Sequence, residues 1–252
     1  MELRTQIKKL SLWIFIIPFV AINLCLFISV NYEIFNNTFL SVDQIGRSYH
    51  TFPYIDGGVS ISRTARTYPT YLIFKPSMIF ASVLLILYWV KTNKIINTYQ
   101  NLEGKTNLFR TFGILSAVFL IIHSIFLGIK FDYDLYKLFR RFVLLGFIIF
   151  EIVAQSLLVY RFFKLKTLIL KYINNYVLIL KIILVTILVI VAVTSFPIVV
   201  SSGNTHFKHA LEWNYFVGVI TLYLLTFLFW KKELNPSLHT FRCADLSFDP
   251  SF

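Results

Sequence analysis

The chain has few charged residues for its length. They make up 14% of its 252 residues, whereas hydrophobic residues make up 57%. In an ordinary soluble domain, roughly a quarter of the residues are charged. A chain this poor in charge cannot cover its apolar residues with a hydrated surface, which excludes an ordinary water-soluble domain. We expect lipid to be its solvent.

Cysteine is also scarce, because only Cys25 and Cys243 occur. The first lies inside an apolar run and the second near the C-terminal end, so no disulfide framework is expected. No His-Glu-x-x-His motif or other ligand set of fixed spacing is present. The sequence therefore predicts no metal and no cofactor.

Long apolar runs are what the sequence has in abundance. A helix of about 20 residues crosses a hydrocarbon core ~30 Å thick. Six runs of suitable length cover residues 10–30, 71–90, 112–129, 142–160, 176–200 and 211–230. The sequence therefore predicts an all-α polytopic membrane protein, with residues 1–252 forming a single membrane domain built as a six-helix bundle.

The first run follows a basic leader with Arg4, Lys8 and Lys9, as a signal peptide would. Its apolar length exceeds the roughly 7 to 15 residues of a signal-peptide core, and no small-residue cleavage site follows Val30. We therefore expect a retained helix. Trp13, Trp89, Trp213 and Trp230 lie near the ends of the runs, where interface anchors are common.

Lysine and arginine in the connections indicate the orientation. Their distribution favours both termini and the tail 231–252 in the cytoplasm, although the loop 130–141 is more basic than that rule favours. The net charge of +12 is spread over connections that meet anionic headgroups. We expect membrane lipids as partners, leave membrane-protein partners open, and expect no nucleic acid. The location would be an endomembrane (Golgi or ER) or the plasma membrane.

The connection 31–70 is the only long one, and this topology places it outside the cytoplasm. It contains a glycosylation sequon at Asn36 and the stretch FPYIDGGVSISRTARTYP at 52–69. Glycine and proline break helices there, while serine and threonine can bond their own backbone. We expect the loop to fold over the bundle; a solvated loop that caps itself is the alternative.

Two short patches resemble the DRAM/Frag/Sfk family of six-span membrane proteins. They comprise Pro53-Tyr54-Ile55-Asp56, Gly58, Ser60, Ser62, Pro69 and Tyr71, then His206, His209, Leu211-Glu212-Trp213 and Phe229-Trp230. The resemblance implies six helices with a long first loop. It is closest to the branch that remodels the lipid of GPI anchors after attachment, which implies a role in the Golgi.

Charged residues of the long loop and of the last span suggest a lipid-headgroup site. Arginine suits bidentate contact with phosphate, while a carboxylate suits amines or sugar hydroxyls. The predicted headgroup-binding residues are Asp56, Arg63, Arg66, His206, His209 and Glu212. Two alternatives remain: a catalytic pair of His209 with Ser60 or Ser62, and a zinc site formed by both histidines, Glu212 and Asp56.

Ionisable residues inside spans are costly and therefore candidates for function. We expect His123 and Glu151 to lie at similar depth in adjacent helices, as a polar clasp or a proton relay. Gln155 would face the same side as Glu151. Lys181 is expected to extend to the headgroups as an anchor.

Taken together, these patterns favour a non-catalytic membrane protein that binds lipid headgroups. It would act as an accessory or regulatory factor in lipid handling, which the resemblance narrows to GPI-anchor lipid remodelling. The alternatives are an intramembrane lipid hydrolase or acyltransferase and a proton-coupled transporter.

Overall fold

The computed structural model describes residues 2–100, 107–129, 134–200 and 203–231. Six of its helices are long and apolar enough to cross a membrane, and no strand occurs in the described ranges. The six are α1 (Glu2–Val30), α3 (Tyr71–Gln100), α4 (Leu108–Phe126), α5 (Asp134–Lys164), α7 (Asn175–Val200) and α8 (Thr205–Phe229). The short helices are η1 (Tyr32–Phe35), η2 (Gln44–Gly46), α2 (Ile61–Ala65) and α6 (Lys166–Ile169). The predicted all-α six-span bundle is confirmed.

Most helices are longer than the apolar runs that predicted them. α1 begins at Glu2 rather than at residue 10, and α3 continues to Gln100 rather than ending at 90. An apolar run marks only the part of a helix that lies in hydrocarbon, whereas the backbone hydrogen bonds continue into the polar boundary. α4 is the exception at its C-terminal end: it stops at Phe126, before Gly128, whose φ is +84°.

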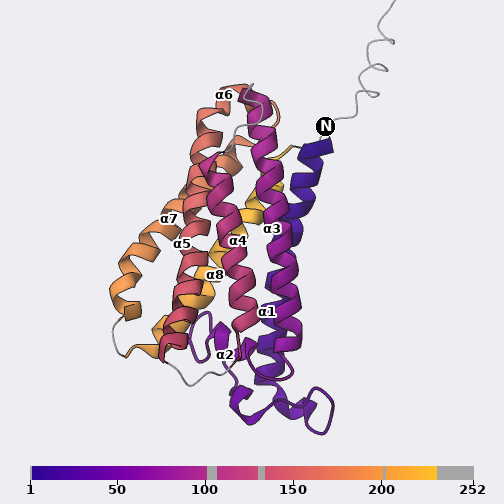
Figure 1. The fold of residues 1–252 in the computed structure, drawn as a ribbon, viewed down its shortest axis with the longest axis vertical. Helices are drawn as coiled ribbons and strands as arrows, with labels where there is room; N and C mark the ends of the chain where they lie inside the picture. Colours follow the sequence, from indigo (N-terminus) through magenta and orange to yellow (C-terminus); the bar gives the residue numbers. More distant parts are fainter. Residues whose placement is uncertain (1, 101–106, 130–133, 201–202, 232–252) are drawn as a thin grey trace, which may run out of the picture.

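The long helices form a closed ring. Each packs against the next in the order α1, α3, α4, α5, α7, α8 and back to α1. Figure 1 shows them running along one common direction, with α2 and the long loop at one end of the bundle and α6 at the other. We call these the loop end and the α6 end. α8 begins at the loop end, beside the segment that follows α1.

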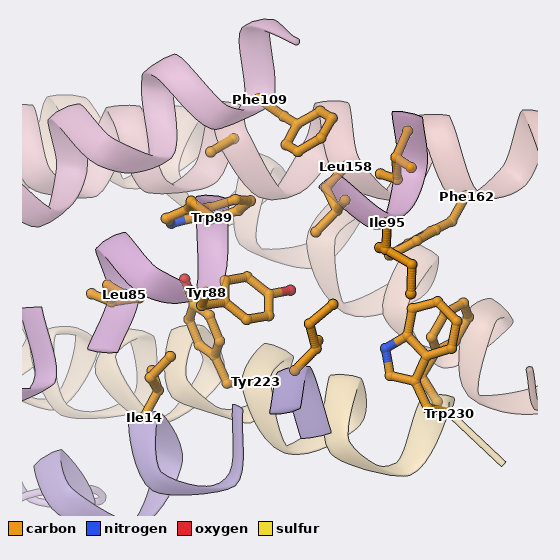
Figure 2. Packing of buried hydrophobic residues seen from close by; sticks show 14 of the residues in the cluster. Ile14, Leu85, Tyr88, Trp89, Ile95, Phe109, Leu158, Phe162, Tyr223 and Trp230 are labelled. Carbon is orange, nitrogen blue, oxygen red and sulfur yellow. The ribbon is translucent and has the colours of Figure 1, made fainter. Parts of the chain in front are cut away.

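Aromatic side chains fill the interior of the ring. Tyr88 and Trp89 of α3 are fully buried, and the rings of Tyr88 and Tyr223 meet edge to face with centroids 5.1 Å apart (Figure 2). Gly113 of α4 allows Trp89 to approach, because a Cβ there would lie 2.2 Å from the indole. In lipid, helices associate through such close packing rather than through the hydrophobic effect.

Candidate functional site at the loop end

The chain returns into the bundle after α1. Ile61 and Ala65 of α2 are buried against Cys25 of α1 and Trp213 of α8. Because α1 continues for more than a turn past Cys25, α2 lies within the loop end and not above it. Ser60 starts this short helix: its Oγ accepts the backbone N–H of Arg63 at 3.2 Å, as an N-cap does.

The first turns of α8 hold the loop by its carbonyl groups. Side chains spaced along one face of α8 each bond one main-chain oxygen of the loop. Loop side chains add to these contacts, because the Tyr54 hydroxyl donates to Asn23 Oδ1 of α1 at 2.9 Å. The contacts are His206 Nδ1 to Asp56 O (3.2 Å), His209 Nδ1 to Gly57 O (3.0 Å), Trp213 Nε1 to Val59 O (2.8 Å) and Asn214 Nδ2 to Tyr54 O (2.7 Å). The predicted folding of the loop over the bundle is confirmed.

Gly57 is where the loop comes closest to α8. Its φ is +61°, in the left-handed region that favours glycine. A Cβ at this position would lie 1.7 Å from the carbonyl oxygen of His206. Both the backbone conformation and the close approach therefore require glycine here.

The Asp56 carboxylate is used by its own loop. Oδ1 accepts the Thr51 hydroxyl at 2.6 Å and the Gly58 N–H at 2.8 Å, and Oδ2 accepts the Phe52 N–H at 2.7 Å. The Thr51 hydroxyl, followed by the Gly58 N–H, holds the pKa of Asp56 below its usual range. The carboxylate thus stays ionised and organises the turn, a role that differs from the headgroup contact predicted for it.

Glu212 has a comparable role on α8. The backbone N–H groups of Ser62 and Ile61, in the first turn of α2, lie close enough to its carboxylate to favour the ionised form. These N–H groups have no partner within a helix, so a carboxylate is well suited to them. Glu212 therefore favours this orientation of α2, which carries Arg63 and has Arg66 as its C-cap.

Arg63 and Arg66 are the predicted headgroup ligands that remain available. Both are exposed, and neither guanidinium has a hydrogen bond or ion pair with a described residue. Arg63 lies within electrostatic range of His209. The site therefore consists of two exposed arginines on a short helix that α8 holds in place.

The serine and histidine candidates for catalysis do not form a pair. Ser60 Oγ lies 3.3 Å from Ser62 Oγ, and no hydrogen bond joins either serine to His209 in the described part of the chain. Because a carbonyl only accepts, His209 Nδ1 carries the proton in its bond to Gly57 O. Residues 2–231, outside the gaps given above, contain no cluster of three His, Cys, Asp or Glu side chains suited to a metal.

The structure does not bring His123 and Glu151 together. Glu151 lies level with Ser116 of α4, about two helical turns (~10 Å) from His123, which lies within electrostatic range of Arg140 instead. The buried Glu151 carboxylate has three side-chain donors. They are Ser116 Oγ (2.7 Å), Gln155 Nε2 (3.0 Å) and the Tyr223 hydroxyl.

Lys181 does not extend to the headgroups, as its sequence position suggested. It is fully buried, and its Nζ donates to Thr226 Oγ1 at 2.6 Å. Lys181 lies within electrostatic range of Glu151 without a direct salt bridge. Trp89, Trp213 and Trp230 are likewise buried, while Trp13 is 52% exposed; the first three are core residues and not interface anchors.

Sequence reasoning missed several of these residues for a common reason. Asn214, Ser116 and Tyr223 have ordinary side chains for a membrane helix, so nothing in the sequence separates them from their neighbours, while Trp213 was interpreted as an interface anchor. Only the carbonyl or carboxylate that each one contacts gives it a role. The pairing of Gln155 with Glu151 was accessible, because a spacing of four residues places both on one helix face.

No protein-family model, curated protein or solved structure matches this chain. The case for a function therefore rests on the site.

Replacing Gly57 with alanine should release the loop from α8. The new methyl group cannot fit beside the His206 carbonyl, so amide hydrogen exchange across residues 52–62 should rise in Gly57→Ala. Gly203→Ala is the matched control, because Gly203 also has a positive φ (+99°) but no atom within 4 Å of its Cβ position. If exchange near residue 203 rises as much in Gly203→Ala as exchange across 52–62 does in Gly57→Ala, backbone strain alone, and not the contact with α8, is responsible.

Replacing Glu151 with leucine should destabilise the bundle. Three buried donors lose their acceptor, which costs roughly 1–3 kcal/mol of unfolding free energy, and thermal unfolding in detergent would show it as a lower Tm. Glu151→Gln keeps an acceptor oxygen and should lose less. If Glu151→Gln has the wild-type Tm but abolishes function in cells, Glu151 has a chemical role beyond holding helices together.

Proposed function

We propose that this protein binds lipid headgroups at the loop end through Arg63 and Arg66. The observation that carries the proposal is the contrast between these arginines and their neighbours. The Asp56 carboxylate is bonded by groups of its own loop, and the Glu212 carboxylate faces the first backbone N–H groups of α2. The two guanidinium groups are exposed and have no hydrogen-bond or ion-pair partner among the described residues.

The position of α2 favours a lipid as the ligand. α2 packs level with Cys25, inside the last turns of α1, which is the depth at which a spanning helix meets the headgroups. A guanidinium presents a fork of donors that matches two phosphate oxygens at once. Soluble molecules reach this depth less readily than lipids that already lie beside it.

The protein would act as an accessory or regulatory factor in lipid handling. The arrangement of Ser60, Ser62 and His209 offers no activated nucleophile, which supports a binding role over a lipid hydrolase or acyltransferase. The resemblance of two short patches to the DRAM/Frag/Sfk family supports lipid remodelling of GPI anchors as the process. Membrane lipids are its expected partners, together with any membrane protein that it regulates.

We further propose that the loop end faces the lumen or the cell exterior and that both termini are cytoplasmic. The distribution of lysine and arginine supports this orientation. The six apolar helices make the protein an integral membrane protein, and the Golgi, the ER or the plasma membrane would be its location.

Cysteine labelling tests the orientation. In a Cys243→Ser background the remaining Cys25 is buried, so an impermeant maleimide should report only on an introduced thiol. Lys171→Cys, near α6, should react once the plasma membrane is permeabilised. Tyr49→Cys replaces a loop side chain that is 91% exposed. This thiol should react in intact cells if the protein is in the plasma membrane, and only after internal membranes are dissolved if it is in the Golgi or the ER. The reverse pattern would overturn the orientation.

If the proposed function is right, replacing both arginines should change the lipid profile of the cell. In cells lacking the protein, the double variant Arg63→Gln/Arg66→Gln should fail to restore the lipid profile, GPI anchors included. Lys164→Gln/Lys171→Gln, which removes the same charge from the α6 end, should restore it. If the arginine variant restores the profile at equal expression, headgroup binding at this site is wrong.

A further inference from the structure

A third arginine joins the two on α2. Partial burial lowers the pKa of Arg66, and the positive charges of Arg140 and Arg63 lower it further. Arg140 belongs to the first turns of α5, far from α2 along the chain. Arg63 and Arg140 therefore both lie within electrostatic range of Arg66, and a bound anion would reduce the repulsion among the three charges.

Close backbone packing brings Arg66 near the segment that carries Arg140. Gly128, which follows α4, lies against the main chain of Arg66, since a Cβ there would come within 2.7 Å of the Arg66 carbonyl oxygen. The end of α4 packs on the start of α5 through edge-to-face contacts of Phe126 with Tyr136 and Phe139. Arg66 and Arg140 are thus held on adjoining, packed segments.

No described acidic side chain pairs with these arginines. Arg140 Nε is buried and has no hydrogen-bond partner. Its guanidinium lies over the Tyr136 ring, 6.0 Å from the centroid. By contrast, Lys75, also at the loop end, donates to the Ile125 carbonyl at 3.2 Å. A buried donor without a partner costs free energy that a ligand can recover.

We propose that Arg63, Arg66 and Arg140 form one phosphate site whose ligand is a lipid bearing a phosphate monoester. This inference rests on the proposed function and specifies its ligand. A monoester carries a charge of about −1.5 to −2 at pH 7 and three strong acceptor oxygens, whereas a diester carries about −1 and only two unesterified oxygens. Three guanidinium groups together carry +3, which the monoester balances better than the diester does, and the monoester offers one unesterified oxygen to each fork.

Binding of short-chain lipids to the purified full-length protein in detergent tests the proposal. The probes are dioctanoyl phosphatidic acid, which is a monoester, and dioctanoyl phosphatidylglycerol, which is a diester. Wild type should bind the monoester about tenfold more tightly, as expected for one additional charge-assisted contact. Arg140→Gln should remove the preference and leave binding of the diester nearly unchanged. Arg141→Gln, at the exposed neighbouring residue, should behave as wild type.

The outcomes separate the two proposals. Equal binding of both lipids by wild type, lost in Arg63→Gln/Arg66→Gln, overturns the monoester site and leaves the proposed function standing. Absence of binding to either lipid overturns both. Inorganic phosphate that competes as well as phosphatidic acid would support the three-arginine site and overturn a lipid as its ligand.

A folding control keeps the Arg140 variant interpretable. Arg140→Gln and wild type should give the same thermal unfolding in detergent without lipid. If Arg140→Gln unfolds early, Arg140→Lys replaces it, because lysine retains the charge but lacks the fork. The monoester preference should then fall several-fold without disappearing, and an unchanged preference would overturn the role of Arg140.

Discussion

The hydrogen bonds from α8 to the carbonyl groups of the loop are the interaction on which the loop end depends. A long connection with two glycines would otherwise have many backbone conformations, and fixing each residue costs on the order of 1–2 kcal/mol in conformational entropy. Four side chains from the first turns of α8 offset part of that cost by bonding main-chain oxygens directly. Trp213 also fills the space beneath α2, so the same helix both orients and supports the loop.

The closed ring of helices makes this interaction possible. α8 is last along the chain, yet it lies beside α1, so its first turns meet the loop that α1 begins. Its other end provides Tyr223 and Thr226 to the buried polar groups of α5 and α7. α8 therefore connects the loop end to the interior. A change in its packing would alter both the loop contacts and the buried polar contacts.

Polar groups in this protein fall into two kinds, according to whether their partners are already present. Glu151, Lys181, Asp56 and Glu212 have partners within the chain, as buried or structural charges require. Arg140 has a buried Nε without one, and Arg63 and Arg66 are exposed and unpaired. The paired groups explain how the helices and the loop are held, and the three arginines are the charged groups of the proposed site that a ligand could still contact.

Much of the architecture was accessible from the amino-acid sequence, because hydrocarbon requires each spanning segment to satisfy its own backbone, and an apolar run of sufficient length has only the helix to do so. The six spans and the turn-forming character of the long loop follow from that local rule. The roles of individual side chains did not follow. Ser116 contacts Glu151 where His123 was expected, Lys181 is buried, and Arg140 lies with Arg66, because these contacts depend on which helices are neighbours and how they are rotated. Local composition does not encode helix rotation; it results from packing around the closed ring.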